Sequence, residues 1–484
     1  MATRIMLLEL LNDDPHNQHR TQLYPFIQGM HLEAGNEVSW LTVPAGGEDR
    51  PAPYVVALPR AAGPRLMDEL ATFQPRVLVA NETLDEAFAA DVRRAAPGVA
   101  LVKTGMGWDL PAAAWPDGER EAYPTALDFP RLRYESRLLG PDEAWAPHRT
   151  PVMCGAPCVY NRPVADNPRY RGVDLGATTY RHGCAFCTHP DLGTLRLPRT
   201  PALQLALGQL AAFHRDAPPW RRNGRFAVDG GALNRRLGPF LQGLLDLGPP
   251  PSELYLTLRV DELLEAEPHL LAHLPALAAA GHSLHLWNIG MENLSAAENE
   301  RLNKGISSAQ VHQATALLRR LERSWPGAFV WSRHGGYGMI LFTPWTTLDD
   351  LAANARGLGE LALARCGALV CSRLQLRPGT AAEGLARRDS LVLEGADALA
   401  AVPPDLSCLT DAADSELVWR FAHPEAHAAY CLMLALFPQH GPPASEALND
   451  PAAGLALVVR AVRDNPGADH EALLQVVMKA VSSK

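Results

Sequence analysis

Residues 180–187 read Tyr-Arg-His-Gly-Cys-Ala-Phe-Cys and lie near the middle of a chain that has few cysteines. Two residues separate Cys184 from Cys187. The turn between cysteines at this spacing lets both sulfur atoms point the same way and bind one metal centre. The stretch therefore predicts a metal-binding loop, and the surrounding sequence has to indicate which metal it holds.

The cysteines of the chain are unevenly distributed. Four of the eight lie within residues 154–187, at positions Cys154, Cys158, Cys184 and Cys187. Crowding of this kind in a cytoplasmic protein favours metal binding over disulfides. The other four stand in apolar helical or strand context and are predicted to be buried hydrophobic residues: Cys366, Cys371, Cys408 and Cys431.

Composition narrows the class of protein. At 484 residues the chain is long enough for two or three domains. Its net charge of -9 is spread without long basic runs, so no nucleic-acid partner is expected. The apolar run 5–11 is too short to span a bilayer and is not followed by a signal-peptide cleavage site. We therefore expect a cytoplasmic protein with no membrane partner.

The first part of the chain alternates strand and helix patterns. Buried-strand runs occupy residues 5–10, 38–43, 77–80 and 99–102, and helical spacing occupies residues 22–34 and 65–73. Alternation of this kind predicts a doubly wound parallel sheet within a domain of residues 1–145 that ends in a linker. Ligands of such sheets bind beyond the carboxyl ends of the strands, so the loop 14–19 is of interest.

The second part repeats the same rhythm. Strand patterns occupy residues 226–228, 254–258, 282–287, 338–342 and 372–376, and helical patterns occupy 308–325 and 263–280, the latter broken by Pro268 and Pro275. Each strand pattern precedes a loop with Gly, Pro or charged residues, which predicts a βα barrel over residues 146–395 with its chemistry at one face. Residues 396–484 are predicted to form a helical extension, with helices over 415–436, 453–464 and 469–481.

Residues 183–187 resemble the cluster loop of the radical S-adenosylmethionine (SAM) family. That family has the pattern Cys-x3-Cys-x2-Cys, whose three thiolates hold a 4Fe-4S cluster and leave one iron open for SAM. Cys184, Phe186 and Cys187 match the last two cysteines and the aromatic residue between them. Tyr180 stands where the first cysteine is expected.

Four later segments resemble motifs of the same family, in the same order. They are Asp229-Gly230-Gly231, Gly290–Asn293 with Leu302–Gly305, Gly338–Pro344 with Thr347–Asp350, and Leu376–Thr380 with its Pro-Gly-Thr. By resemblance, Gly230 and Gly231 bind the methionine end of SAM, and Glu292 contacts SAM. From the residues alone, Gly230-Gly231 equally fits a tight turn, and Arg259 and Asp261 fit an ion pair after a strand.

The N-terminal part resembles the cobalamin-binding domain that often precedes such a barrel. Asp14-x-His16 matches a fragment of its Asp-x-His-x-x-Gly signature, with His19 where glycine belongs. The resemblance implies that His16 ligates cobalt. A solvated loop residue is the alternative reading of the same histidine.

The clustered cysteines are consistent with three accounts. In the first, Cys154 or Cys158 supplies the third cluster ligand, or Tyr180 does so as a phenolate. In the second, all four cysteines form a closed zinc site. In the third, no metal binds and the thiols are reduced core residues.

The resemblance implies an iron-sulfur enzyme that cleaves SAM and modifies an unreactive carbon, with methyl transfer where cobalamin is bound. It also implies an external electron donor and a small-molecule or peptide substrate, which the sequence does not identify. The alternative is a catalytically degenerate barrel that binds a partner, with zinc or no metal at its cysteines.

Overall fold

A computed structural model describes most of the chain. It covers residues 2–11, 24–45, 55–103, 132–154, 158–178, 180–188, 201–332, 337–363, 372–394, 417–437 and 450–482. These residues divide into two compact units. Unit 1 comprises 1–157, 196–256 and 269–285, and unit 2 comprises 158–195, 257–268 and 286–484.

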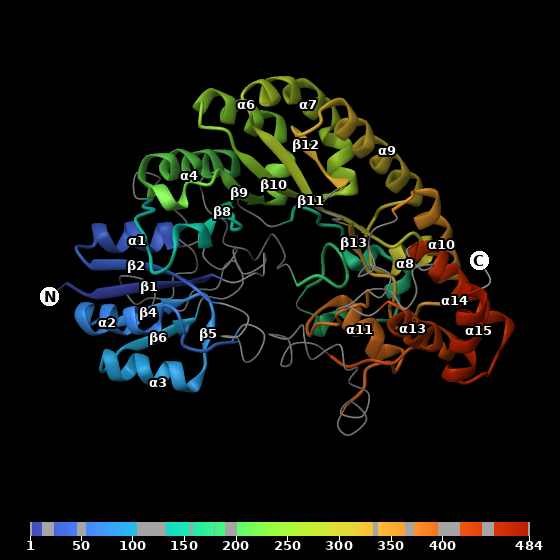
Figure 1. The fold of residues 1–484 in the computed structure, drawn as a ribbon. Helices are drawn as coiled ribbons and strands as arrows, with labels where there is room; N and C mark the ends of the chain where they lie inside the picture. Colours follow the sequence, from blue (N-terminus) through green and yellow to red (C-terminus); the bar gives the residue numbers. More distant parts are fainter. Residues whose placement is uncertain are drawn as a thin grey trace. The chain divides into compact units, whose positions relative to one another are not determined.

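The N-terminal part of unit 1 is a parallel sheet with helices on both faces, as predicted (Figure 1). Its strand order is β6-β4-β1-β2-β7, and all neighbours are parallel. The strands are β1 (Arg4–Leu11), β2 (Glu37–Pro44), β4 (Val77–Ala80), β6 (Ala100–Lys103) and β7 (Arg137–Leu138). Helix α1 (Tyr24–Glu33) covers one face, and α2 (Gly63–Phe73) and α3 (Glu86–Ala95) cover the other. The short strands β3 (Val55–Val56) and β5 (Thr83–Leu84) pair separately.

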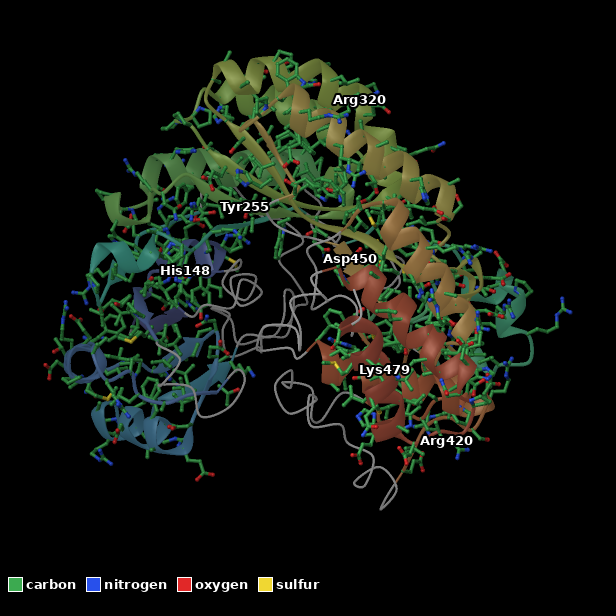
Figure 2. All side chains as sticks on the ribbon, turned by 45° about the vertical axis from the view of Figure 1, so that its right-hand side comes forward. His148, Tyr255, Arg320, Arg420, Asp450 and Lys479 are labelled. Atoms are coloured by element: carbon green, nitrogen blue, oxygen red, sulfur yellow. The ribbon has the colours of Figure 1, made fainter. Side chains whose placement is uncertain are left out.

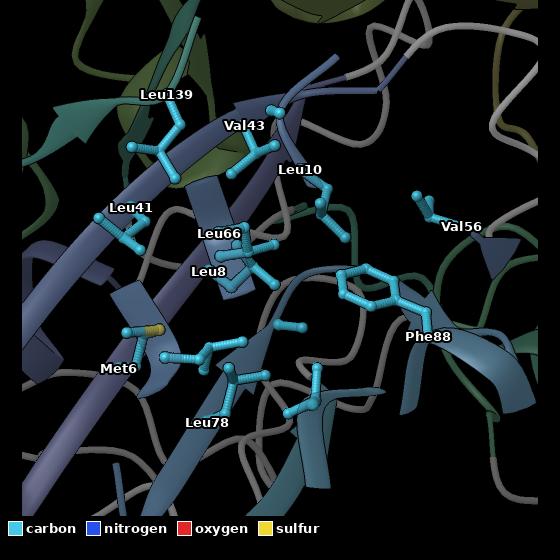
Figure 3. Close-up of a cluster of buried hydrophobic side chains, with 14 of the residues drawn as sticks. Met6, Leu8, Leu10, Leu41, Val43, Val56, Leu66, Leu78, Phe88 and Leu139 are labelled. Atoms are coloured by element: carbon cyan, nitrogen blue, oxygen red, sulfur yellow. The ribbon is translucent and has the colours of Figure 1, made fainter. Parts of the chain in front are cut away.

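Continuous apolar runs explain why the inner strands are buried in the middle of the sheet. Figure 3 shows part of the core between the sheet and α2 and α3, where Met6, Leu8 and Leu10 of β1 belong to one buried cluster with Leu66 and Phe88. Strand β1 is buried from Ile5 to Leu11. A strand buried on both faces needs apolar residues at every position.

One charged residue interrupts the apolar run of β1. Glu9 is buried and accepts two hydrogen bonds of 2.9 Å from the guanidinium of Arg221, which is also buried. The Arg221 guanidinium lies 4.4 Å from the ring centroids of both Trp40 and Trp145. Trp40 and Thr42 also donate to the Glu9 carboxylate. The buried charges are therefore paired and hydrogen-bonded, as burial requires.

The second sheet has the strand order β12-β11-β10-β9-β8, and β13 pairs with β11. Its strands are β8 (Thr150–Met153), β9 (Arg225–Asp229), β10 (Glu253–Arg259), β11 (Ser283–Glu292), β12 (Phe329–Val330) and β13 (Tyr337–Met339). The pairs β8–β9, β9–β10 and β11–β13 are parallel. Helices alternate with these strands, as the barrel prediction required: α4 (Ala202–Asp216), α5 (Gly231–Asn234), α6 (Leu237–Leu247), α7 (Val260–Ala279), α8 (Ala296–Arg301), α9 (Ser308–Ser324), α10 (Leu348–Glu360) and α11 (Ala381–Arg388).

Two details of the barrel prediction were wrong. Helix α7 is continuous over twenty residues and contains both Pro268 and Pro275. Buried leucines recur at helical spacing along it, and this apolar face outweighs the loss of two backbone donors. Residues 372–376 form no strand in the described structure, where Arg373 makes a single bridge to Phe342.

The described residues 417–437 and 450–482 contain three helices: α13 (Pro424–Leu436), α14 (Pro451–Asp464) and α15 (His470–Ser482). Asp450, labelled in Figure 2, caps α14 by accepting from the amides of Ala452 and Ala453. The predicted helix over 415–436 begins only at Pro424, because Trp419 pairs in extended form with Val392. Among the helices that the structure describes, none is both long and apolar enough for a membrane span.

Candidate functional site

The cysteine loop is held by backbone hydrogen bonds to two distant segments of unit 2. The Ala185 amide donates to the Leu302 carbonyl over 2.9 Å, and the Ala382 amide donates to the Ala185 carbonyl over 2.9 Å. A turn closed by the Cys187 amide and the Cys184 carbonyl, 3.1 Å apart, brings the two cysteines together. The loop is therefore fixed between the Leu302–Gly305 motif and the start of α11.

Asn303 is the main side-chain clamp on this loop. Its amide nitrogen donates to the Gly183 carbonyl over 2.7 Å and to the Arg162 carbonyl over 3.3 Å. Its own carbonyl accepts from the Tyr160 hydroxyl over 2.8 Å. Asn303 is fully buried and has a φ of 49°, in the left-handed region that asparagine tolerates better than most residues. Through these contacts the Leu-Asn-Lys-Gly motif holds the loop that carries the thiols.

Tyr180, at the position of the absent first cysteine, pairs with the Pro-Gly-Thr turn. Its amide donates to the Gly379 carbonyl over 3.0 Å, and it forms a parallel bridge with Thr380. The cysteine loop near the start of the predicted barrel and the Pro-Gly-Thr turn near its end both resemble radical SAM motifs. The two segments therefore pair with each other within unit 2.

Cys158 and Cys184 both accept hydrogen bonds from nitrogen donors. The Tyr160 amide donates to the Cys158 sulfur over 3.4 Å, and the Arg259 guanidinium donates to the Cys184 sulfur over 3.4 Å. The same guanidinium lies 3.8 Å from the centroid of the Tyr160 ring. Arg259 also forms the predicted ion pair with Asp261, at 2.9 Å.

Burial and nearby cations act in opposite directions on these thiols. Burial raises the pKa of Cys158 to about 11. Burial also raises the pKa of Cys184, while the charges of Lys304 and Arg259 pull that pKa down. Burial thus disfavours the ionised form of each thiol, and the two cations lie where they stabilise negative charge on sulfur.

Glu292 lies beside the loop in an ion pair with Lys304. The Lys304 Nζ is 2.5 Å from Glu292 Oε1, and both side chains are nearly excluded from solvent. A β-bulge between Gly290 and Glu292 and a φ of 55° at Glu292 set its direction. A Cβ on Gly290 would lie 2.8 Å from both charged atoms, so a side chain there would displace the ends of the ion pair.

Cys154 and Gly230 contact each other in unit 1. A Cβ on Gly230 would lie 2.5 Å from the Cβ of Cys154, so the absence of a side chain lets the ends of β8 and β9 approach. The Cys154 sulfur is buried and donates to the Val152 carbonyl over 3.2 Å. Gly231 begins α5. The close approach accounts for Gly230 structurally, and the SAM-binding role of both glycines stays a prediction.

The structure brings together some of the predicted site residues. Unit 2 contains Cys158, Cys184, Cys187, Phe186 and Glu292, whereas Cys154, Gly230 and Gly231 belong to unit 1. His16 lies outside the described residues. Within the ranges that the structure describes, no three His, Cys, Asp or Glu side chains are grouped as ligands of a single metal ion.

The sequence suggested no individual role for three residues of the site: Tyr160, the clamp residue Asn303 and the cation Lys304. Arg259 was considered only as half of an ion pair. The Leu302–Gly305 motif was noticed, but its contact with the cysteine loop depends on a fold that brings residues about 120 positions apart together.

Comparison with known proteins bears on the fold. No family model and no curated protein matches the chain. Solved structures of the cobalamin-dependent S-adenosylmethionine radical enzyme OxsB do match. The apo form has a TM-score of 0.55 at 11% identity, covering 99% of this chain and 74% of OxsB. The form with aqua-cobalamin has a TM-score of 0.53 at 12% identity, and that with aqua-cobalamin and SAM has 0.52 at 11%, each covering 99% of this chain and 75% of OxsB. The chain therefore has the fold of a cobalamin-dependent radical SAM enzyme.

Proposed function

We propose that this protein is a radical SAM enzyme that holds a 4Fe-4S cluster at Cys184, Cys187 and a third ligand. The observation that carries the proposal is the clamped cysteine loop, in which the Cys184 thiol lies beside Arg259, Lys304 and Glu292. The fold shared with OxsB supports the same reading.

The donor set fits an iron-sulfur cluster. Thiolates are the usual ligands of such clusters, and hydrogen bonds to their sulfurs tune the reduction potential. Arg259 already donates to the Cys184 sulfur, and Lys304 adds a second cation. When bound, the cluster would supply the electron that cleaves SAM and so generates an organic radical.

Residues of the chain would bind SAM and exclude water from it. Glu292 has one carboxylate oxygen paired with Lys304, and we assign its second oxygen to the contact with SAM. Gly230 and Gly231 would bind the methionine end, and Phe186 packs against the core beneath the loop. An external electron donor and a small-molecule or peptide substrate belong to this proposal.

Anaerobic reconstitution tests the cluster. The full chain should bind about four irons with matching sulfide and cleave SAM when a reductant is added. Cys184→Ser should lose both properties, and Cys431→Ser, far along the chain in α13, should retain them. One bound zinc with no SAM cleavage would instead support a degenerate barrel that binds a partner.

The doubly wound sheet of unit 1 supports a second part of the proposal, that the chain binds cobalamin and transfers a methyl group. Purified full chain mixed with aqua-cobalamin should retain the cofactor through gel filtration. A changed absorbance spectrum in His16→Ala would identify His16 as a cobalt ligand. Failure of the unmodified chain to retain cobalamin would remove methyl transfer and leave SAM cleavage as a separate question.

A further inference from the structure

We propose that Cys158 is the third thiolate ligand of the cluster, and that Arg259 is the positioning residue that holds the Cys158 segment beside Cys184. This inference rests on the proposed function. It departs from the usual cluster loop, because the third ligand comes from a segment that lies before Tyr180 in the chain.

The first support is the shared environment of the two thiols. The Cys184 sulfur accepts a hydrogen bond from the Arg259 guanidinium, and the Cys158 sulfur accepts one from the amide of Tyr160, whose ring lies against the same guanidinium. Both cysteines lie in unit 2 and are only partly covered, whereas a fully enclosed thiol would be closed to a cofactor. Both thiols are therefore open enough for a cofactor to contact them.

The second support is the contact set of Arg259. Its guanidinium donates to the Cys184 sulfur over 3.4 Å and to the Lys304 carbonyl over 2.8 Å. It also stacks on the Tyr160 ring, and the Tyr160 amide donates to the Cys158 sulfur. One buried side chain thus joins the segment that carries Cys158 to the loop that carries Cys184.

Tyr160 is itself fixed on the loop side. Its hydroxyl donates to the Asn303 carbonyl, and its carbonyl would lie 2.9 Å from a Cβ placed on Gly183. A Cβ on Gly305 would lie 2.4 Å from the Tyr160 hydroxyl. The Cys158–Tyr160 segment therefore packs closely against both the cysteine loop and the Leu302–Gly305 motif.

The other candidates for the third ligand have different surroundings. The Cys154 thiol is fully buried against its own strand end, donates to Val152 and lies under Gly230. The backbone of Tyr180 is engaged with Gly379 and Thr380. Both residues take part in packing or pairing that the fold itself requires.

Serine and phenylalanine substitutions separate these candidates. After anaerobic reconstitution, Cys158→Ser should lose iron and sulfide to the level of Cys184→Ser. Cys154→Ser, Tyr180→Phe and the control Cys431→Ser should match the unmodified chain. Retention of the full cluster by Cys158→Ser would overturn the inference. Loss of the cluster in Cys154→Ser or in Tyr180→Phe, but not in Cys158→Ser, would overturn it as well. An unmodified chain without iron would overturn the proposed function instead.

Alkylation keeps the test valid if Cys158→Ser fails to fold. In the reconstituted unmodified chain, iodoacetamide at alkaline pH followed by peptide mass spectrometry should find Cys158 protected, and removal of iron should expose it to labelling; alkaline pH is needed because burial raises the pKa of this thiol to about 11. Equal labelling of Cys158 with and without the cluster would contradict its role as a ligand.

The role assigned to Arg259 predicts a change in the potential of the cluster. Arg259→Gln removes a cation and an N–H donor to sulfur, so the midpoint potential should shift to more negative values. Arg259→Lys keeps the charge but loses the planar fork and should shift less. The control Arg320→Gln, on the exposed face of α9, should leave the potential unchanged. An unchanged potential in Arg259→Gln would show that Arg259 is only structural.

Discussion

At the scale of single residues, the geometry of the site depends on the buried ion pair of Lys304 and Glu292. Both side chains are at least 90% shielded from solvent, and their charged atoms are 2.5 Å apart. A buried charge is tolerated only while its partner is present. Residues with this arrangement hold the site in one geometry, because removing either partner leaves the other charge uncompensated.

Glu292→Gln and Lys304→Met should therefore each lower the free energy of unfolding by about 3–5 kcal/mol. The double substitution should be less harmful than the two single effects added together, because it leaves no unpaired charge. Urea unfolding of the unmodified chain and the three variants measures this. Glu37→Gln, in the exposed pair with Arg4, is the matched control and should change the free energy by less than about 1 kcal/mol. Additive effects at Glu292 and Lys304 would contradict the coupling.

Glu298 predicts a pH dependence. Burial raises its pKa from 4.5 to about 7, despite its pairing with Arg301 and a 2.7 Å hydrogen bond from Thr343. Between these two values the folded protein binds more protons at this site than the unfolded chain does. Stability from this group is thus complete below the unfolded pKa and is lost as the pH rises through the folded pKa.

The expected loss from Glu298 between about pH 5 and pH 8 is at most about 3 kcal/mol. Glu298→Gln should remove this part of the dependence, which urea midpoints measured across the pH range would reveal. Glu300→Gln, on the same helix α8 but in an exposed pair with Arg169, should keep the slope of the unmodified chain. Identical slopes for the unmodified chain and Glu298→Gln would show that Glu298 is ionised throughout.

At the scale of elements, the cysteine loop depends on its clamp. The Asn303 side chain donates to the Gly183 carbonyl of the loop and to the Arg162 carbonyl, and the neighbouring Leu302 carbonyl accepts from Ala185. Asn303→Ala removes the side-chain donor to the buried Gly183 carbonyl, whereas the Arg162 carbonyl still accepts from the Gly183 amide. The amides of Gly183 and Ala185 should then exchange faster with deuterium, by roughly tenfold for each 1.4 kcal/mol lost.

Hydrogen-exchange mass spectrometry over residues 180–188 measures the effect of Asn303→Ala. Asn465→Ala is a matched control, because Asn465 donates to the Ala461 carbonyl at the end of α14 in the same unit. Exchange in the loop should not change in this control. Unchanged exchange in Asn303→Ala would mean that the backbone bonds to Leu302 and Ala382 are sufficient to hold the loop.

Elements differed in how well the sequence predicted them. The runs that became β1, β2 and β4 were predicted to within one residue at each end, because a strand buried on both faces is a continuous apolar run. The break predicted in α7 was wrong, because burial of an apolar face along the whole helix outweighs the backbone hydrogen bonds that its two prolines remove. The two thiols of the loop were predictable from spacing. The contact of Arg259 with Cys184 was not, because it joins residues 75 positions apart.

At the scale of the whole molecule, the chain passes back and forth between its two units. Three of the five boundaries fall inside single elements: between Leu256 and Thr257 in β10, Pro268 and His269 in α7, and His285 and Leu286 in β11. Domains that fold independently are usually joined by exposed linkers that few contacts cross. A boundary inside a hydrogen-bonded strand or helix instead links the order of one unit to that of the other.

We therefore expect one cooperative thermal transition for the described fold. Arg221→Met, which leaves Glu9 unpaired in unit 1, and Glu292→Gln, which leaves Lys304 unpaired in unit 2, should both shift that same transition to lower temperature. Scanning calorimetry of the two variants and their combination measures this. In a chain of independent units, each variant would shift a separate transition and leave the other in place. The interleaved course of the chain argues against that result, because neither unit can lose β10 or β11 without the other losing part of the same strand.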